Sequence, residues 1–253
     1  MKDVNEQLKK HYDYISNKYG ADRIFFICAY GSMNYNLFDD NSDVDTYAVI
    51  IPDISDIIDM DVVSTTLDVE GEHCVVKDIR LFFKELQKSN VNTLETLITE
   101  YYIANPSYID DYHYLRRLAF YIARMSNNHF LRNCFGMYNQ QYLDYELTGS
   151  GKSAANMYRM GKLILAYLNG RNLLHSYYVH NKFIKDNRRN SYTFPEENLS
   201  KYKKFLENLI NEALFNDDQV LPANTKHFLK TILYDMQSRI ISTYNFKVNS
   251  YGD

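Results

Sequence analysis

A change in hydrophobic periodicity divides this chain into two parts. Between residues 23 and 81, short runs of β-branched and aromatic residues are separated by turn residues, which is typical of β-strands. From Arg80 onward, apolar residues recur at helical spacing. We therefore predict an α+β fold, with a mixed sheet and its helices in residues 1–105 and an all-helical domain in residues 106–253. The sequence has no internal repeat and no low-complexity linker, so we expect the two domains to pack together.

The same periodicities predict the individual elements. In the first part we expect a leading helix over residues 4–19, strands over 23–30 and 44–51, a short helix over 53–58, and a hairpin of 62–69 and 73–81 around Gly71. The helices expected after the hairpin cover residues 81–88, 91–102, 112–125, 127–145, 152–169, 199–213 and 225–244.

Composition excludes a membrane protein. With 45% hydrophobic and 24% charged residues among 253, the chain has enough apolar material for a globular core. Its longest apolar runs, such as 24–30 and 163–168, are far shorter than the roughly 20 residues that span a bilayer. The N-terminus has no apolar segment typical of a secretory signal, so we expect a cytoplasmic protein without a membrane partner.

Net charge and cysteine spacing argue against further classes of function and of site. The formal net charge of −4 argues against a protein that coats nucleic acid without specificity, although it leaves room for a local basic groove. Cys28, Cys74 and Cys134 lack the paired spacing of zinc sites or disulfides, so we expect buried thiols. Five histidines, among them His73, also lack the spacing of metal ligands.

Two aspartates at the start of the second strand are the main candidates for chemistry. Gly31-Ser32 follows the first predicted strand, and ten residues separate Ser32 from Asp43-Val44-Asp45. Because side chains alternate along a strand, Asp43 and Asp45 should point the same way. Two adjacent carboxylates repel each other unless a cation neutralises them, and hard divalent ions prefer oxygen ligands. We therefore expect Asp43 and Asp45 to hold Mg²⁺, with Mn²⁺ as an alternative, although an acidic turn at a strand start is also common.

A third carboxylate, Asp78, lies in the second arm of the predicted hairpin. If that arm pairs beside the strand of Asp43 and Asp45, Asp78 completes a triad able to hold two metal ions. In that arrangement Asp43 and Asp45 bridge the metals, and Asp78 is the ligand on the side of the attacking hydroxyl. Gly31 would allow the backbone to approach a phosphate, and the Ser32 hydroxyl would donate to it.

A polar stripe on a later helix suggests phosphate binding. Lys152, Asn156 and Arg159 follow the spacing i, i+4, i+7 and so share one face of an otherwise apolar helix. We expect this face to contact a nucleotide; the alternative is a solvated helix face. The tripeptide Gly151-Lys152-Ser153 is not a P-loop, because that motif requires glycine where the chain has Glu146.

A second basic cluster is harder to assign from sequence. Lys182, Lys185, Arg188 and Arg189 lie close together in the chain. They could contact a nucleic-acid backbone, or they could belong to a solvated loop. Both interpretations remain open at this stage.

The motifs together resemble a known superfamily. Gly-Ser, a spacer, Asp-x-Asp at the head of a strand and a later lone Asp resemble the signature of polymerase-beta nucleotidyltransferases. The segments 30–37, 42–45 and 77–83 more narrowly resemble predicted phage and bacterial nucleotidyltransferases related to the RNA-repair-associated group, and the similarity extends to about residue 105. The resemblance implies a mixed-sheet catalytic core, two Mg²⁺ ions and an NTP donor such as ATP. It also implies a Lys and an Arg from a C-terminal helix over the triphosphate, a role that matches Lys152 and Arg159.

These observations favour one function and leave two alternatives. The first hypothesis is an enzyme that transfers a nucleoside monophosphate from an NTP to a hydroxyl acceptor, an RNA end or a protein side chain, and releases pyrophosphate. The second is a catalytically silent module that binds a nucleotide or RNA. The third is a transferase that modifies a small molecule such as an antibiotic. The acceptor, the base of the NTP and the oligomeric state are open at the level of sequence.

Overall fold

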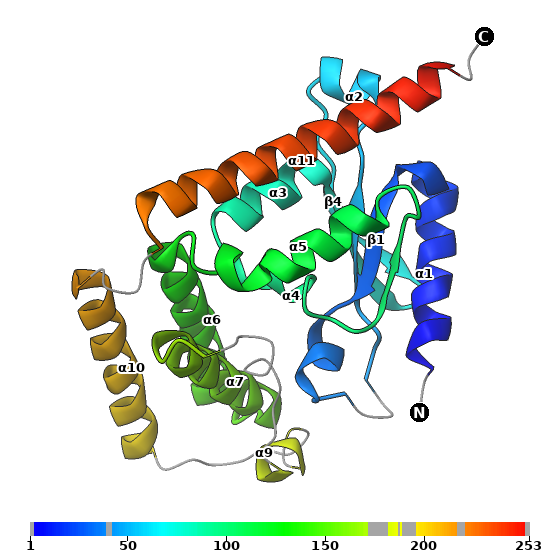
Figure 1. The fold of residues 1–253 in the computed structure, drawn as a ribbon. Coiled ribbons are helices and arrows are strands. Elements are labelled where there is room, and N and C mark those ends of the chain that lie inside the picture. The colour runs from blue at the N-terminus through cyan, green and yellow to red at the C-terminus, as the bar shows by residue number, and fades with distance from the viewer. Residues whose placement is uncertain are drawn as a thin grey trace.

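The computed structural model describes residues 3–38, 42–171, 182–186, 188, 196–216 and 221–250. The fold is α+β, as the sequence predicts, with a mixed five-stranded sheet in the order β3-β4-β2-β1-β5 (Figure 1). No helix in these ranges is long and apolar enough to cross a membrane.

The sheet is built around two fully buried strands. These are β1 (Ile24–Ala29) and β2 (Thr46–Ile50), which pair antiparallel. On the other side of β2, the strand β4 (Glu72–Asp78) runs parallel to it, with Thr46 opposite Cys74 and Ile50 opposite Asp78. Strand β3 (Ser64–Val69) pairs antiparallel with β4, which confirms the predicted hairpin. Its turn requires glycine because Gly71 has φ +85°.

Helices cover both faces of the sheet. On one face lies α1 (Val4–Tyr19), whose Leu8 and Ile15 belong to one apolar cluster with Ile24 and Ile27 of β1 and Ala48 and Ile50 of β2. On the other face lie α3 (Ile79–Gln87) and α5 (Ile109–Ile122), and Phe26 stacks on Tyr112 at a centroid distance of 4.4 Å. The shorter elements here are η1 (Ala21–Arg23), η2 (Gly31–Tyr35), α2 (Ile54–Ile58) and α4 (Val91–Glu95).

The later part of the described chain is helical. Its elements are α6 (Asn127–Thr148), α7 (Gly151–Leu168), α9 (Lys182–Asp186), α10 (Glu196–Asn216) and α11 (Ala223–Ser250). Helices α6 and α7 pack against each other. The long helix α11 runs back across α3, which itself packs on the sheet (Figure 1). One apolar cluster therefore contains residues from both sides of residue 105, including Phe25 and Tyr244.

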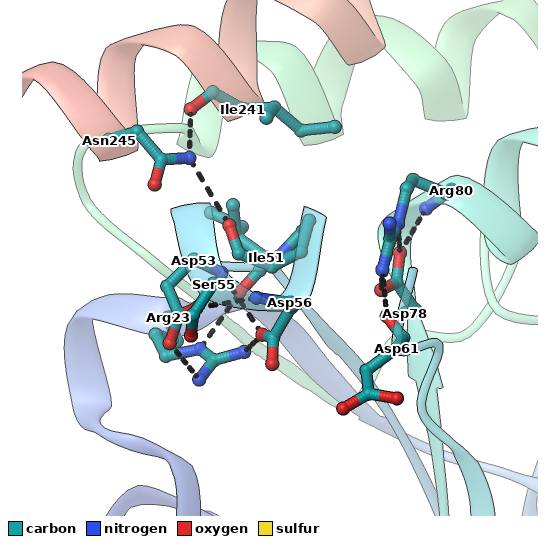
Figure 2. A network of polar contacts seen from close by, with 11 residues as sticks. Arg23, Ile51, Asp53, Ser55, Asp56, Asp61, Asp78, Arg80, Ile241 and Asn245 are labelled. Atoms are coloured by element: carbon teal, nitrogen blue, oxygen red, sulfur yellow. Dashed lines mark hydrogen bonds and ion pairs between the residues drawn. The ribbon is translucent and has the colours of Figure 1, made fainter. Parts of the chain in front are cut away.

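Polar contacts fasten α11 to the earlier part of the chain. Arg239 donates to both carboxylate oxygens of Asp111 on α5, at 3.0 Å for Nη1. Further along, the Asn245 side chain donates to the carbonyl of Pro52 at 3.2 Å, next to α2 (Figure 2). Arg23 holds that same region, because it donates to the carbonyl of Ile51 and to Asp53.

One predicted helix is wrong. Residues 91–102 do not form a continuous helix: α4 ends at Glu95, and β5 (Tyr102–Ala104) follows and pairs with β1. A three-residue edge strand has too little alternation to be recognised in a sequence, and it is stable only because β1 supplies its hydrogen bonds.

The predicted second arm of the hairpin is also too long. Strand β4 ends at Asp78, and α3 begins at Ile79.

We expect Asp111 and Arg239 to be energetically coupled. In a double-mutant cycle of Asp111→Ala and Arg239→Ala, the coupling free energy should be about 0.5–1 kcal/mol, because the Arg239 side chain is 59% exposed and solvent weakens the pair. Urea unfolding of the four proteins measures it. In a control cycle that combines Asp111→Ala with Lys230→Ala, an exposed residue of α11, the two changes in unfolding free energy should be additive. Equal coupling in both cycles would contradict the pairing of α11 with α5.

Candidate functional site

One large cavity contains most of the residues singled out by the sequence. It has a volume of about 830 Å³, and it is lined by the turn after β1, by the segment just before β2, and by residues of α4, α6 and the start of α7. The predicted residues that line it are Gly31, Ser32, Asp43, Asp45, Lys152, Asn156 and Arg159. Its other lining residues include Tyr30, Tyr35, Asn92, Thr148, Ser150 and Arg188. Residues more than 100 positions apart in the chain thus meet at one site, which we call the central cavity.

The turn after β1 forms one wall of the central cavity. Gly31 has φ +78°, a left-handed conformation that favours glycine, and a Cβ atom there would lie 3.5 Å from Oδ2 of Asp45. The Gly31 amide donates to Oε1 of Glu95 at 2.7 Å. This amide therefore already has an acceptor within the protein. The Ser32 hydroxyl is the better candidate in this turn for donating a hydrogen bond to a ligand.

Asp43 and Asp45, which we call the acidic pair, lie just before β2. Val44 between them is fully buried, in contact with Val4 and Ala29, while both aspartates line the central cavity. Because β2 begins at Thr46, the two aspartates lie outside the strand in which the sequence placed them. Burial raises the pKa of Asp45, and the charge of Asp43 raises it further, whereas His73 and Lys152 lower it. The site thus concentrates negative charge that a cation would relieve.

A buried polar network supports the acidic pair from behind. The amide of Val44 donates to Oε1 of Glu72 at 3.2 Å. His11 of α1 lies with Nδ1 2.7 Å from the hydroxyl oxygen of Thr46 and with Nε2 3.4 Å from Oε2 of Glu72. Burial lowers the pKa of His11, although Glu72 acts in the opposite direction. These contacts fix the backbone on both sides of Asp45.

Asp78 is not brought to the acidic pair. In the parallel pairing of β2 with β4, Asp78 lies opposite Ile50, at the far end of the strand that begins beside Asp45. There it accepts the Arg80 amide at 2.7 Å as the N-cap of α3, and it forms an ion pair with the Arg80 guanidinium, which also binds the carbonyl of Asp61 (Figure 2). His73 instead neighbours Asp45, with Nδ1 3.6 Å from its Oδ1.

Helix α7 directs its first two turns to the central cavity. Its N-cap Ser150 accepts from the Ser153 amide, and the residues at its start line the cavity. Lys152 is exposed and forms no ion pair within the described part of the chain. Asn156 donates to Gln141 at 3.1 Å. Arg159 is only 5% exposed, and its guanidinium lies 3.6 Å from the ring centroid of Tyr35. The predicted stripe therefore faces a cavity, and a helix N-terminus adds partial positive charge there.

One member of the second basic cluster also reaches this site. Arg188 lines the central cavity, donates to the carbonyl of Leu37, and lies 3.5 Å from the Ser42 hydroxyl. Lys182 is exposed. The side chain of Lys185 and the whole of Arg189 lie outside the described residues.

The acidic pair offers two carboxylates to a cation. Within the described ranges, no group of three or more His, Cys, Asp or Glu side chains could hold a metal ion. The acidic pair is nevertheless the kind of donor set that Mg²⁺ uses, since this ion is commonly held by one or two carboxylates together with water and substrate phosphates. The three cysteines are buried, and burial raises the pKa of Cys74 to about 11, so they offer no thiolate ligand.

Sequence reasoning missed Glu95. This side chain is 1% exposed, and burial raises its pKa to about 7, while the charge of Arg159 lowers it. Both its carboxylate oxygens accept hydrogen bonds from the turn after β1. The available signal was a lone acidic residue between the buried Leu94 and Leu97, a position that an exposed charge would not occupy.

Comparison with known proteins does not assign the chain: no protein-family model matches the sequence, and no curated protein matches it.

We expect Asp78 to be a structural residue. Asp78→Ala removes a helix N-cap and leaves Arg80 without its carboxylate, so the free energy of unfolding should fall by about 1–3 kcal/mol. Urea unfolding measures it. Asp61→Ala is the control, because Arg80 contacts the backbone carbonyl of Asp61 and not its exposed side chain. If Asp78→Ala were as stable as the control, the structural role would be wrong.

We also expect Glu95 to give the stability a pH dependence. Because folding raises the pKa of Glu95 from 4.5 to about 7, its contribution to stability is present below pH 4.5 and is lost as the pH rises to about 7. The free energy of unfolding of Glu95→Gln, minus that of the wild type, should therefore increase between these pH values and then level off. Urea unfolding at several pH values tests this, with the exposed Glu100→Gln as a control. If the difference in unfolding free energy between Glu95→Gln and the wild type does not vary with pH, the pKa of Glu95 is not raised.

Proposed function

We propose that this chain is a metal-dependent nucleotidyltransferase, which transfers a nucleoside monophosphate from an NTP to a hydroxyl acceptor. The observation that carries the proposal is the meeting of two kinds of charge in the central cavity. The acidic pair lines it from the start of β2, and Lys152 and Arg159 line it from α7. Its volume of about 830 Å³ lies within the range of small-molecule sites.

The negative charge of the acidic pair suits the metal ion of an NTP–metal complex, and the positive charge of Lys152 and Arg159 suits its phosphates. Asp43 and Asp45 would hold Mg²⁺ or Mn²⁺, which supplies positive charge to the triphosphate when bound. Lys152, Arg159 and the N-terminus of α7 offer donors and positive charge to the remaining phosphate oxygens. The Ser32 hydroxyl adds a neutral donor. A polymerase-beta type core, which the sequence motifs resemble, would use its aspartates in this way.

The reaction itself breaks one bond and forms one. The acceptor hydroxyl oxygen bonds to the α-phosphorus, the bond from that phosphorus to the bridging oxygen breaks, and pyrophosphate leaves with the electron pair while the acceptor proton passes to solvent. The contribution of this chain is to position the triphosphate and to balance its charge, which are the main sources of rate in phosphoryl transfer. An RNA end and a protein side chain are the acceptors we propose.

The position of Asp78 favours a second candidate. Among the residues that the structure describes, no third carboxylate joins the acidic pair in a metal-binding group, and Asp78 lies at the other end of β4. A module that binds a nucleotide or RNA without transferring it requires no such ligand. The assay below separates the two functions, since the module would bind an NTP and transfer nothing.

We expect Asp43→Asn and Asp45→Asn to lose transfer at least 100-fold without losing stability. Burial and Asp43 raise the pKa of Asp45, so its ionised form costs stability at pH 7 and the neutral amide removes that cost. Transfer is measured with each α-³²P-labelled NTP, Mg²⁺ or Mn²⁺, and RNA or cell lysate as acceptor; thermal unfolding is measured in parallel. Asp110→Asn, an exposed change outside the cavity, is the control.

Three outcomes are informative. Label on RNA or protein that is absent with the two variants supports the transferase and identifies the acceptor class. Binding of an NTP without transfer supports the silent module. A large loss of thermal stability in Asp43→Asn or Asp45→Asn would instead mean that the acidic pair is structural.

A further inference from the structure

We infer that Glu95 is a positioning residue, which holds the turn Gly31–Tyr35 and, through Tyr35, the side chain of Arg159 in the arrangement that binds the nucleotide. The inference rests on the proposed function, because it concerns the same site. Glu95 does not line the central cavity and is almost fully buried, so it can act on a ligand only through other residues.

Glu95 holds the turn through three of its five residues. Oε1 accepts the Gly31 amide at 2.7 Å and the Asn34 side-chain amide at 2.9 Å, and Oε2 accepts the Tyr35 hydroxyl. The Asn34 side chain also donates to the carbonyl of Ala29, the last residue of β1. One carboxylate thus fixes both ends of the turn that carries Ser32 and lies against Asp45.

The same carboxylate reaches α7 through an aromatic ring. The Tyr35 hydroxyl is bonded to Glu95, while the Tyr35 ring lies 3.6 Å from the guanidinium of Arg159. The charges of Arg159 and Glu95 also attract each other, as the lowering effect of Arg159 on the Glu95 pKa shows. Cation–π contacts of buried arginine depend on the position of the ring. Glu95 is therefore one determinant of the position of Arg159 over Tyr35.

A purely structural explanation of Glu95 is weaker. Burying a carboxylate is costly, and an apolar residue would fill a core position of α4 without that cost. The hydrogen bonds of Glu95 go to the turn after β1, and its electrostatic attraction reaches Arg159; both border the central cavity. Glu85 provides a contrast, because its carboxylate binds Lys77 and Thr93, neither of which lines the cavity.

Three substitutions distinguish the hydrogen bonds of Glu95 to the turn from its effect on Arg159 through Tyr35. Glu95→Ala removes all of them. Glu95→Gln keeps an oxygen for Gly31 and Asn34 and offers an NH₂ group to the Tyr35 oxygen, so it can rescue the geometry without the charge. Tyr35→Phe removes only the hydroxyl bond and leaves the ring beneath Arg159. Glu85→Ala is the matched control, since it deletes a partly buried, hydrogen-bonded glutamate away from the cavity.

Two measurements on the full chain test the inference. The first is hydrogen exchange of peptides that cover residues 30–36, because the Gly31 amide loses its acceptor in Glu95→Ala. The second is the affinity for the fluorescent mant derivatives of ATP, GTP, CTP and UTP, each in the presence of Mg²⁺. We expect Glu95→Ala to speed exchange of the turn at least 10-fold and to weaken binding at least 10-fold. Glu95→Gln should stay within about 3-fold of the wild type, and Tyr35→Phe should lie between them.

The outcomes separate this inference from the proposed function. If the wild type binds none of the four nucleotides, the proposed function fails, and exchange of the turn still decides whether Glu95 holds it. If Glu95→Ala leaves both exchange and affinity unchanged, or changes them no more than Glu85→Ala, the inference is wrong. If Glu95→Ala does not fold, Tyr35→Phe decides: faster exchange and weaker binding support the inference, and unchanged values overturn it.

Discussion

The burial of Val44 between two aspartates is the constraint on which the site depends. Because Val44 packs into the core with Val4 and Ala29, Asp43 and Asp45 face the central cavity together. Two carboxylates in this position repel each other, and partial burial raises the pKa of Asp45 further. The fold therefore maintains an unfavourable concentration of charge, and the apolar packing of β1 and β2 supplies the stability for it.

Buried polar residues hold this arrangement at its edges. Glu72 binds the Val44 amide from β4, His11 approaches Thr46 from α1, and Glu95 binds the turn after β1 from α4. Each comes from a different element, so the position of the acidic pair is determined by the whole first part of the fold. Groups of this kind are costly to bury unless they are hydrogen-bonded, and here they contact the residues beside the site.

The helical part completes the cavity and does not stand apart from the sheet. Helix α7 brings Lys152 and Arg159 to the cavity, and α11 returns across α3 to pair Arg239 with Asp111 of α5. The shared apolar cluster runs through both parts. A site assembled in this way responds to changes in either part, because the acidic and the basic residues reach it from separate elements.

The sequence alone determined the fold class, the hairpin and the shared face of Lys152, Asn156 and Arg159, because hydrophobic periods of two and 3.6 residues mark strands and helices. The orientation of the acidic pair follows instead from the burial of Val44, since both aspartates precede β2. Only the tertiary structure decided which strands pair and which side chains lie beside the acidic pair. The parallel register of β2 and β4 puts His73 and not Asp78 beside Asp45, and β5 exists because β1 offers it hydrogen bonds. Glu95 acquired its role from residues some 60 positions away, a distance that local periodicity does not encode.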